Sequence, residues 1–353
     1  MKKIFLILTV VFLCAMPVSA QENIYNDKVT DFISEYNIDF EGIKEYPFKT
    51  LWGTVKETVK NGINKPSKVF YKIVAVLLIT SLIGFFATDN TKQIINIVNI
   101  VSVLVLFVNI TDYYLLVIEQ INNGLFQIKS FMSAFIPIFA GVAFASGEMI
   151  TSTVYTGFFM LCVVTVANFC ISYIVPSVNL FLALGITSSI SNVVKLKPIC
   201  EFYSKAVKIA MTAAVSLLCF VLTLQTTITQ GQDSLAVKTG KFIVSGAVPV
   251  IGSALQSAVG SIYASMGVLK GFFGIAGIVV IVNIFLPAII NLVVNWVGYY
   301  LVAVLGEMLE NETAADLLYC FKDVTEILLS MCVLFMVLLV FSLTIMIKIS
   351  GGI

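Results

Sequence analysis

The sequence predicts an all-α polytopic membrane protein, on three observations. Of its 353 residues, 59% are hydrophobic and only 12% are charged, whereas a soluble domain carries about 25% charged residues. The apolar residues form long runs interrupted by single charges, and about 20 apolar residues cross a bilayer as a helix. The first twenty residues have the pattern of a secretory signal. We therefore expect a cleaved signal peptide followed by about 6–10 membrane segments.

Residues 1–20 contain the three parts of a signal peptide. Lys2 and Lys3 form a basic start, an apolar core runs from Ile4 to Met16, and Val18-Ser19-Ala20 offers a small-residue cleavage site. Because the core is short for a membrane span, cleavage is favoured over an uncleaved anchor. Cleavage would place the next segment on the extracytoplasmic side of the membrane.

Residues 21–68 are polar and carry charges of both signs. Apolar residues recur at helical spacing on both sides of Pro47, which predicts two short amphipathic helices. A segment of this size builds little core of its own, so we expect it to lie on the extracytoplasmic membrane surface. A partner-binding domain is the alternative. The membrane domain then comprises residues 69–353.

The membrane domain divides into uncharged runs that are candidate spans. Prolines predict breaks between short helices, because a proline removes one helical hydrogen bond and bends the helix. Breaks are expected in the run 130–147, before a shorter helix after Pro176, and near Pro287 within 271–306. Whether 130–147, 176–192 and 242–269 cross the membrane or re-enter it is open. The clearest spans are 73–88, 93–111, about 150–175, 209–232 and 327–347.

Two parts of the chain, about 93–205 and 206–306, share short motifs in the same order. Their matching members are Lys129, Ser133 and Pro137 with Lys241, Ser245 and Pro249; Gly157-Phe158-Phe159 with Gly271-Phe272-Phe273; and Asn168 and Pro176 with Asn283 and Pro287. Internal repeats are frequent in membrane transport folds. We therefore expect an internal tandem repeat with short helices broken at Pro and Gly.

The lysines predict the orientation of the chain. Lys195, Lys197, Lys205 and Lys208 cluster between two spans with only Glu201 against them, and the positive-inside rule places such a loop in the cytoplasm. If the N-terminal segment is outside, the first span brings Lys92 inside, so the chain crosses an even number of times before Lys195. Four crossings satisfy this, as do two crossings with two re-entrant segments. The acidic residues between 307 and 326 are expected to form a solvated cytoplasmic segment.

No enzymatic site is expected. The chain has no histidine, which removes the commonest general base and metal ligand, and its scattered cysteines form no C-x-x-C pair. We expect no catalytic residue, no cofactor and no metal, and the net charge of +1 gives no basis for a nucleic-acid partner. Glu148 is a candidate for a polar path because ionisable residues at membrane depth are functional candidates by default. A short turn without function is the alternative.

The stretch from Gly246 to Ser261 reads GAVPVIGSALQSAVGS, an unusual composition for a membrane helix. Its small residues would let another helix approach closely, which predicts a tightly packed helix with a kink at Pro249. Alternatively Pro249 and Gly252 break the helix, and Gln256 faces a path. Irregular backbone survives in a membrane only when it is buried in protein or lines water. Both interpretations are open.

A specific signature precedes this stretch. The sequence from Gln230 through Asp233, Lys238 and Lys241 to Phe242-Ile243, continuing to Pro249-Val-Ile-Gly252, resembles the signature of the stage III sporulation protein AE family of endospore-forming Firmicutes. The resemblance extends over most of the chain. Lys238 stands where the family has arginine, which keeps the charge, and Glu148 is unusual for the family.

The resemblance implies a membrane, permease-like subunit of a mother cell–forespore channel or secretion-like complex required for endospore formation. Its implied partners are the other stage III sporulation A proteins, AA to AH, and the forespore partner stage II sporulation protein Q. The implied location is the mother-cell membrane around the forespore, with energy from a partner ATPase. Copies of the chain are also candidate partners of one another. The alternatives are a stand-alone secondary transporter of a small solute and a structural membrane scaffold. A transporter should keep a coupling carboxylate in mid-membrane, and the sequence has no clear one.

Overall fold

The computed structural model describes residues 47–86, 92–147, 149–190, 202–221, 223 and 252–349. These residues form helices and two tight turns, without strands in the described ranges, so the all-helical prediction is confirmed. Six of the helical stretches are long and apolar enough to cross a membrane. The elements are α4 (Pro47–Phe85), α5 (Lys92–Ala145), α6 (Met149–Phe169), the π-helix η2 (Cys170–Ile174), α7 (Val175–Ile190), the helix Phe202–Val221, α9 (Gly252–Met308) and α10 (Glu312–Ile349).

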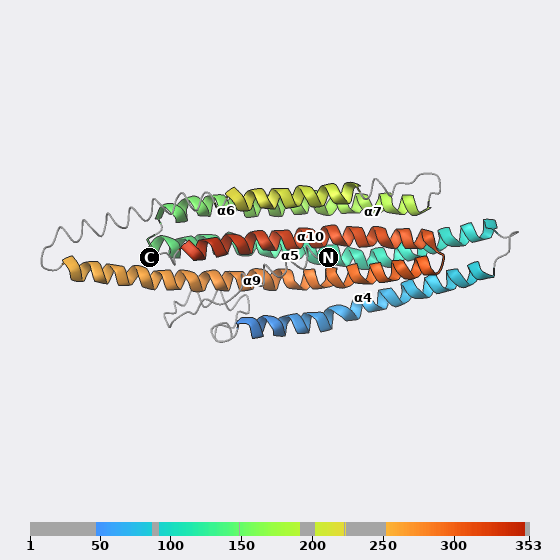
Figure 1. Ribbon diagram of the computed structural model, residues 1–353, viewed down its shortest axis with the longest axis horizontal. Helices are drawn as coiled ribbons and strands as arrows, with labels where there is room; N and C mark the ends of the chain where they lie inside the picture. Colours follow the sequence, from blue (N-terminus) through green and yellow to red (C-terminus); the bar gives the residue numbers. More distant parts are fainter. Residues whose placement is uncertain are drawn as a thin grey trace.

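The helices lie side by side in one elongated bundle (Figure 1). α9 is the central scaffold, since it packs against α4, α5 and α10. α10 is the most enclosed of the described helices. In its most apolar stretch of 18 residues, 78% of the residues are buried, whereas in that of α4 only 17% are buried. An apolar helix that is buried all round belongs to the core of the bundle, whereas α4 leaves one side open.

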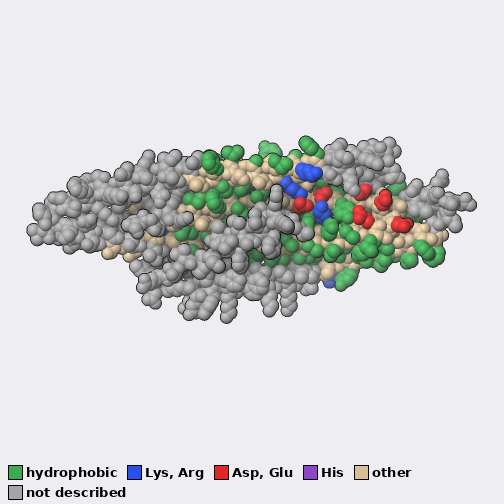
Figure 2. All heavy atoms as spheres, viewed as in Figure 1, with side chains coloured by type: hydrophobic (Ala, Val, Ile, Leu, Met, Phe, Trp, Pro, Cys, Tyr) green, Lys and Arg blue, Asp and Glu red, His purple; other side chains and the backbone are tan. Residues whose placement is uncertain are grey.

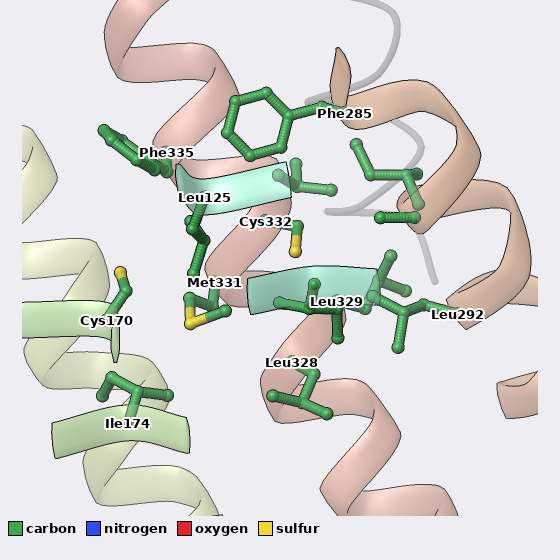
Figure 3. Close-up of a cluster of buried hydrophobic side chains, with 14 of the residues drawn as sticks. Leu125, Cys170, Ile174, Phe285, Leu292, Leu328, Leu329, Met331, Cys332 and Phe335 are labelled. Carbon is green, nitrogen blue, oxygen red and sulfur yellow. The ribbon is translucent and has the colours of Figure 1, made fainter. Parts of the chain in front are cut away.

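The core is formed where α5, η2, α9 and α10 meet (Figure 3). Phe285 of α9 packs edge-on against Phe335 of α10, with ring centroids 5.7 Å apart. Leu125 of α5 is buried in the same cluster. Cys170 and Cys332 are fully buried there as well, so these cysteines pack as small apolar side chains.

Two of the predicted breaks are wrong, because α5 runs unbroken through Pro137 and α9 runs unbroken through Pro287. A proline removes one hydrogen bond, and packing against neighbouring helices compensates for that loss inside a membrane bundle. A Cβ atom at Gly277 of α9 would lie 2.5 Å from the ring of Phe135. This close contact holds the part of α5 around Pro137 against α9.

The predicted boundary near Pro176 takes the form of a π-helix rather than a loop. Pro176 cannot donate to the carbonyl of residue 172, and residue 172 lies inside η2, Cys170–Ile174. The wider π turn accommodates the missing hydrogen bond, and the chain continues directly into α7. The two predicted helices are therefore present without a gap between them.

The N-terminal polar segment is partly described. Its second expected amphipathic helix is not separate, because α4 begins at Pro47 and continues without a break into the first span. Proline is well tolerated at the first position of a helix. The signal peptide and the first amphipathic helix lie outside the described residues. The tandem repeat remains a prediction, since Lys241, Ser245 and Pro249 also lie outside them.

The described chain runs back and forth along the bundle. Between Lys92 and Ile190 it makes two long passes, α5 and then α6–η2–α7, and residues 130–145 and 176–190 are continuous parts of these passes. The end of α4, the start of α5, the end of α7 and the α9–α10 turn all lie at the same end of the bundle (Figure 1). We call it the turn end. Lys208 of the predicted lysine cluster lies against Glu326 of the predicted acidic segment.

The helices are longer than one upright bilayer crossing. α5 has 54 residues and α9 has 57, which correspond to about 80 Å at 1.5 Å per residue. The hydrocarbon core of a bilayer is only about 30 Å thick. An upright bundle therefore extends well beyond the hydrocarbon core.

Candidate functional site

A layer of aromatic, amide and charged side chains crosses the bundle at one level. Ring contacts tie four helices together there: Phe70 of α4 lies 5.3 Å from Tyr299 of α9, and Tyr299 lies 5.8 Å from Phe321 of α10. Tyr114 of α5 lies 5.9 Å from the same Phe321. We call this the polar layer; its further members are Tyr113 and Gln120 on α5, Asn291, Asn295, Trp296 and Tyr300 on α9, Lys322, Asp323 and Glu326 on α10, and Tyr203 and Lys208 on the helix Phe202–Val221.

Amide side chains join α5 and α9 within this layer. Asn291 Nδ2 donates to Gln120 Oε1 at 2.8 Å. Asn295 Nδ2 donates to the Tyr113 hydroxyl at 3.3 Å and to the backbone carbonyl of Asn291 at 2.8 Å. Because residues four apart share one helix face, both asparagines lie on the side of α9 that meets α5. We call this contact region the α5–α9 seam.

Several buried side-chain oxygens on α5 and α9 have no hydrogen-bond partner among the described residues, and those of Asn291 and Asn295 lie in the seam. The others include Thr111 Oγ1, the Tyr114 hydroxyl and the side-chain oxygen of Asn122. The Tyr114 and Asn295 side chains are each only 2% exposed. A buried polar group without a partner costs about 1–3 kcal/mol, and such groups commonly bind ordered water. The unpaired oxygens of Asn291 and Asn295 therefore give the seam groups that an ordered water could bind.

A charged cluster lies on the other side of α9, between α10 and the helix Phe202–Val221. Lys208 Nζ lies 2.7 Å from Glu326 Oε1, and Lys322 Nζ lies 2.7 Å from Asp323 and 3.7 Å from Glu326 Oε2. These side chains are 20–26% exposed. Figure 2 shows lysine and acidic side chains gathered in the half of the bundle nearer the turn end. Both oxygens of Glu326 thus face an ammonium group, and the cluster has no net charge.

Sequence reasoning did not find this layer. Lys208 was expected in a cytoplasmic lysine cluster, and Lys322 and Glu326 in a solvated acidic segment. The structure makes residues 312–326 the first part of α10, and this brings Glu326 against Lys208. The two asparagines of the layer could have been predicted from the sequence. Asn291 and Asn295 stand four residues apart in an otherwise apolar run, which puts them on one helix face.

The sequence-predicted site residues lie far from the polar layer or outside the described chain. Gly252 is the first residue of α9 and Gln256 follows within its second turn, so this part of the small-residue stretch is helical. Asn291 is 39 residues after Gly252, which puts the start of α9 about 60 Å away. Pro137 lies on the exposed side of α5. The other candidates, Asp233, Lys238, Lys241, Pro249 and Glu148, lie outside the described residues.

Two residues from the first half of the predicted repeat, Lys129 and Asn168, are in contact. Lys129 Nζ donates to Asn168 Oδ1 at 3.1 Å and so joins α5 to α6. Asn283, the predicted counterpart of Asn168, lies within α9, and its side-chain oxygen has no partner among the described residues. The contact gives Lys129 a local role in holding two helices together.

The acidic residues that were expected in a solvated segment are exposed at the α9–α10 turn. Glu307, Glu310, Glu312 and Asp316 line an open cavity of about 780 Å³. The turn itself is fixed by Asn311, whose side-chain oxygen accepts the backbone N–H of Ala314 at 3.2 Å and caps α10. The four carboxylates therefore mark an end of the bundle that faces water.

The comparisons with known proteins assign a family. The family model for stage III sporulation protein AE matches residues 31–350. No curated protein and no solved structure matches the chain significantly. Because the matched region includes the whole bundle and nearly all of the 353 residues, the chain belongs to the stage III sporulation protein AE family.

Proposed function

We propose that the protein is the membrane, permease-like subunit of a channel or secretion-like complex between mother cell and forespore, required for endospore formation. Family membership supports a role in stage III of sporulation. Six helices that are long and apolar enough to cross a membrane support a membrane subunit.

The α5–α9 seam is the observation that carries the channel part of this proposal. A protein with a purely structural role in the membrane gains nothing from buried oxygens without partners, because each unsatisfied group in an apolar interior is costly. A conduit, in contrast, must keep polar groups along the path of what it conducts. The side-chain oxygens of Asn291 and Asn295 supply such groups on one face of α9.

The charged cluster argues against a stand-alone secondary transporter. A coupling carboxylate in such a transporter exchanges a proton or cation during each cycle and so needs a free oxygen facing the path. Both oxygens of Glu326 lie beside lysines. This arrangement favours a fixed structural ion pair and an energy source in a partner ATPase.

The proposal includes location and partners. The protein would lie in the mother-cell membrane around the forespore, with its N-terminal segment between the two membranes. There it would meet the forespore partner stage II sporulation protein Q, alongside the other stage III sporulation A proteins.

Two experiments test the function. A clean deletion should lower the yield of heat-resistant spores by several orders of magnitude, and normal yield would refute a role in sporulation. Asn291→Leu together with Asn295→Leu should reduce spore yield at least tenfold at unchanged protein level, because the seam loses its polar lining. Val293→Leu with Val297→Leu is the matched control on an exposed face of α9. Full sporulation of the double asparagine variant would contradict a conducting role for the seam.

A further inference from the structure

Lys129 is a charged residue of α5 that lies far from the charged cluster of the polar layer. Its Nζ atom donates to Asn168 Oδ1 of α6 at 3.1 Å. No Asp or Glu among the described residues forms an ion pair with it. An ammonium group has three donors, and the amide nitrogen of Asn168 has two more. The pair therefore combines a positive charge with several donors, and the described chain supplies no acidic partner.

Contacts between the helices fix the level of Lys129 in the bundle. α5 and α9 are antiparallel, and the ring of Phe135 in α5 lies against Gly277 in α9. Lys129 lies six residues before Phe135, so it is level with the part of α9 six residues after Gly277, next to Phe285. Phe285 packs against Phe335 of α10. Lys129 is therefore level with this core contact between α9 and α10.

The same level is the middle of a layer of the bundle that has the thickness of a bilayer. α10 is uncharged over residues 327–347, which extend about 30 Å at 1.5 Å per residue, like the hydrocarbon core of a bilayer. The helix Phe202–Val221 runs beside α10 in the same direction from the Lys208–Glu326 pair (Figure 1). The apolar stretches of α5, α6 and α9 also include this level, whereas that of α4 begins only at Pro66, near the polar layer.

The bundle surface around Lys129 and Asn168 is largely apolar. Phe126, Leu161 and Phe169, all within two turns of the pair on α5 and α6, are 66%, 60% and 44% exposed. Lipid chains can cover these side chains, but a charged side chain at mid-depth is costly in lipid. Lysines escape this cost by reaching the interface when they lie near a helix end, and Lys129 is about 15 Å from either end of the uncharged run.

We propose that Lys129 and Asn168 form a docking site for a membrane helix of a partner protein that carries a carboxylate at this depth. Charge complementarity carries the choice of partner, because a carboxylate accepts hydrogen bonds through both oxygens and the pair supplies charge-assisted donors. A membrane helix delivers such a group from within the bilayer. A dissolved anion would have to leave water alone to reach the same depth, which is costly.

A second copy of this chain does not supply the carboxylate from the helices that cross this layer. At this depth the described residues of α5, α6, α9 and α10 include neither Asp nor Glu. Glu119 and Glu326, the nearest acidic residues of α5 and α10, lie at the polar layer. The partner is therefore a different membrane protein, and the inference rests on the proposed role as a subunit of a complex.

Photocross-linking in sporulating cells tests the site in the full-length chain. A photoreactive benzoylphenylalanine in place of Phe126, about one turn before Lys129, should cross-link to a membrane helix of another protein. Mass spectrometry of the cross-linked peptide should find an Asp or Glu within about one turn of the attachment point. The matched control carries the same group at Leu115, which is 54% exposed and lies about three turns earlier on the same face of α5.

Lys129→Gln tests the charge. Glutamine keeps a donor for Asn168, so α5 and α6 should stay in contact and the protein level should not change. The cross-link from position 126 should fall at least tenfold, while any cross-link from position 115 should not change. Lys129→Arg keeps the charge and should keep the cross-link. Lys129→Glu should abolish it, and changing the partner's acidic residue to lysine in the same cells should restore it.

Four results would overturn the docking site. They are cross-links from position 126 to lipid alone or to nothing, cross-links to a second copy of this chain, a partner helix without an acidic residue near the attachment point, and equal cross-linking by Lys129→Gln. Any of these beside a deletion that abolishes sporulation would refute only the docking site. A deletion without effect would refute the proposed function itself.

Discussion

At the scale of single residues, the bundle depends on a few very close approaches. A Cβ atom at Gly298 would run into the ring of Phe70, and one at Gly185 would run into the sulfur of Cys320. Such contacts let α4 and α7 approach α9 and α10 more closely than any larger side chain allows. Glycine is thus required at these positions for packing rather than for turns.

The Lys208–Glu326 pair makes a prediction at this scale. Glu326→Gln leaves the ammonium of Lys208 half-buried without a carboxylate and should destabilise the protein by about 1–3 kcal/mol. Exchanging the charges, Lys208→Glu with Glu326→Lys, should recover much of that loss. Thermal unfolding of the detergent-purified protein measures both, and Lys205→Gln on the exposed side of the same helix is the control. A charge exchange no more stable than the single variant would refute the pairing.

At the scale of elements, the long helices depend on packing rather than on local preference. α9 keeps helical geometry through Pro287 because uncharged residues surround it and neighbouring helices contact it. The same chain turns into a π-helix before Pro176. A proline is thus accommodated either within a continuous α-helix, as at Pro287, or by a wider π-helical turn, as before Pro176.

This distinction predicts opposite outcomes for two substitutions in α9. Pro287→Ala restores a hydrogen bond to a helix that is already continuous, so it should leave stability unchanged or raise it. Gly277→Leu forces a side chain into the ring of Phe135 and should destabilise the protein by about 1–3 kcal/mol, as overpacking does at a close contact. Midpoints of thermal unfolding decide the comparison, and loss of the fold in Pro287→Ala would show that the proline shapes α9.

At the scale of the whole molecule, the end of α4, the start of α5, the end of α7 and the α9–α10 turn lie at the turn end (Figure 1). Lys205 lies in the first turn of the helix Phe202–Val221, between Tyr203 and Lys208 of the polar layer, and Asp316 lies in the first turns of α10. Both helices begin in the half of the bundle nearer the turn end (Figure 1), which predicts the same side of the membrane for both starts.

Labelling with a membrane-impermeant thiol reagent tests this topology. Lys205→Cys and Asp316→Cys, each in a chain whose Cys200 and Cys219 are serine, should react only after the cells are permeabilised. Reaction of Lys205→Cys in intact cells would reverse the orientation. Different behaviour of the two sites would contradict the shared orientation, because both helices begin in the half of the bundle nearer the turn end (Figure 1).

The sequence predicted the fold class and the family of this protein, but it did not predict the polar layer. Uncharged runs of about 20 residues are sufficient to predict membrane helices, and the stretch from Gln230 to Gly252 was sufficient to suggest the family. The number of separate helices was overestimated, because Pro137 and Pro287 were interpreted as breaks. The rule that a proline breaks a helix considers only neighbouring residues in the sequence. It takes no account of contacts between residues more than a hundred positions apart, such as that of Phe135 with Gly277.

By itself the sequence determined that the chain is helical, apolar and built for a membrane, since these properties follow from composition and from the spacing of charges. It also determined that the chain has no histidine and no C-x-x-C pair. Only the tertiary structure decided that Lys208 meets Glu326 and that Tyr113 and Gln120 meet the amides of α9. The physical reason is that the register between neighbouring helices is set by side-chain packing across the whole bundle, and this register selects which polar residues share a level.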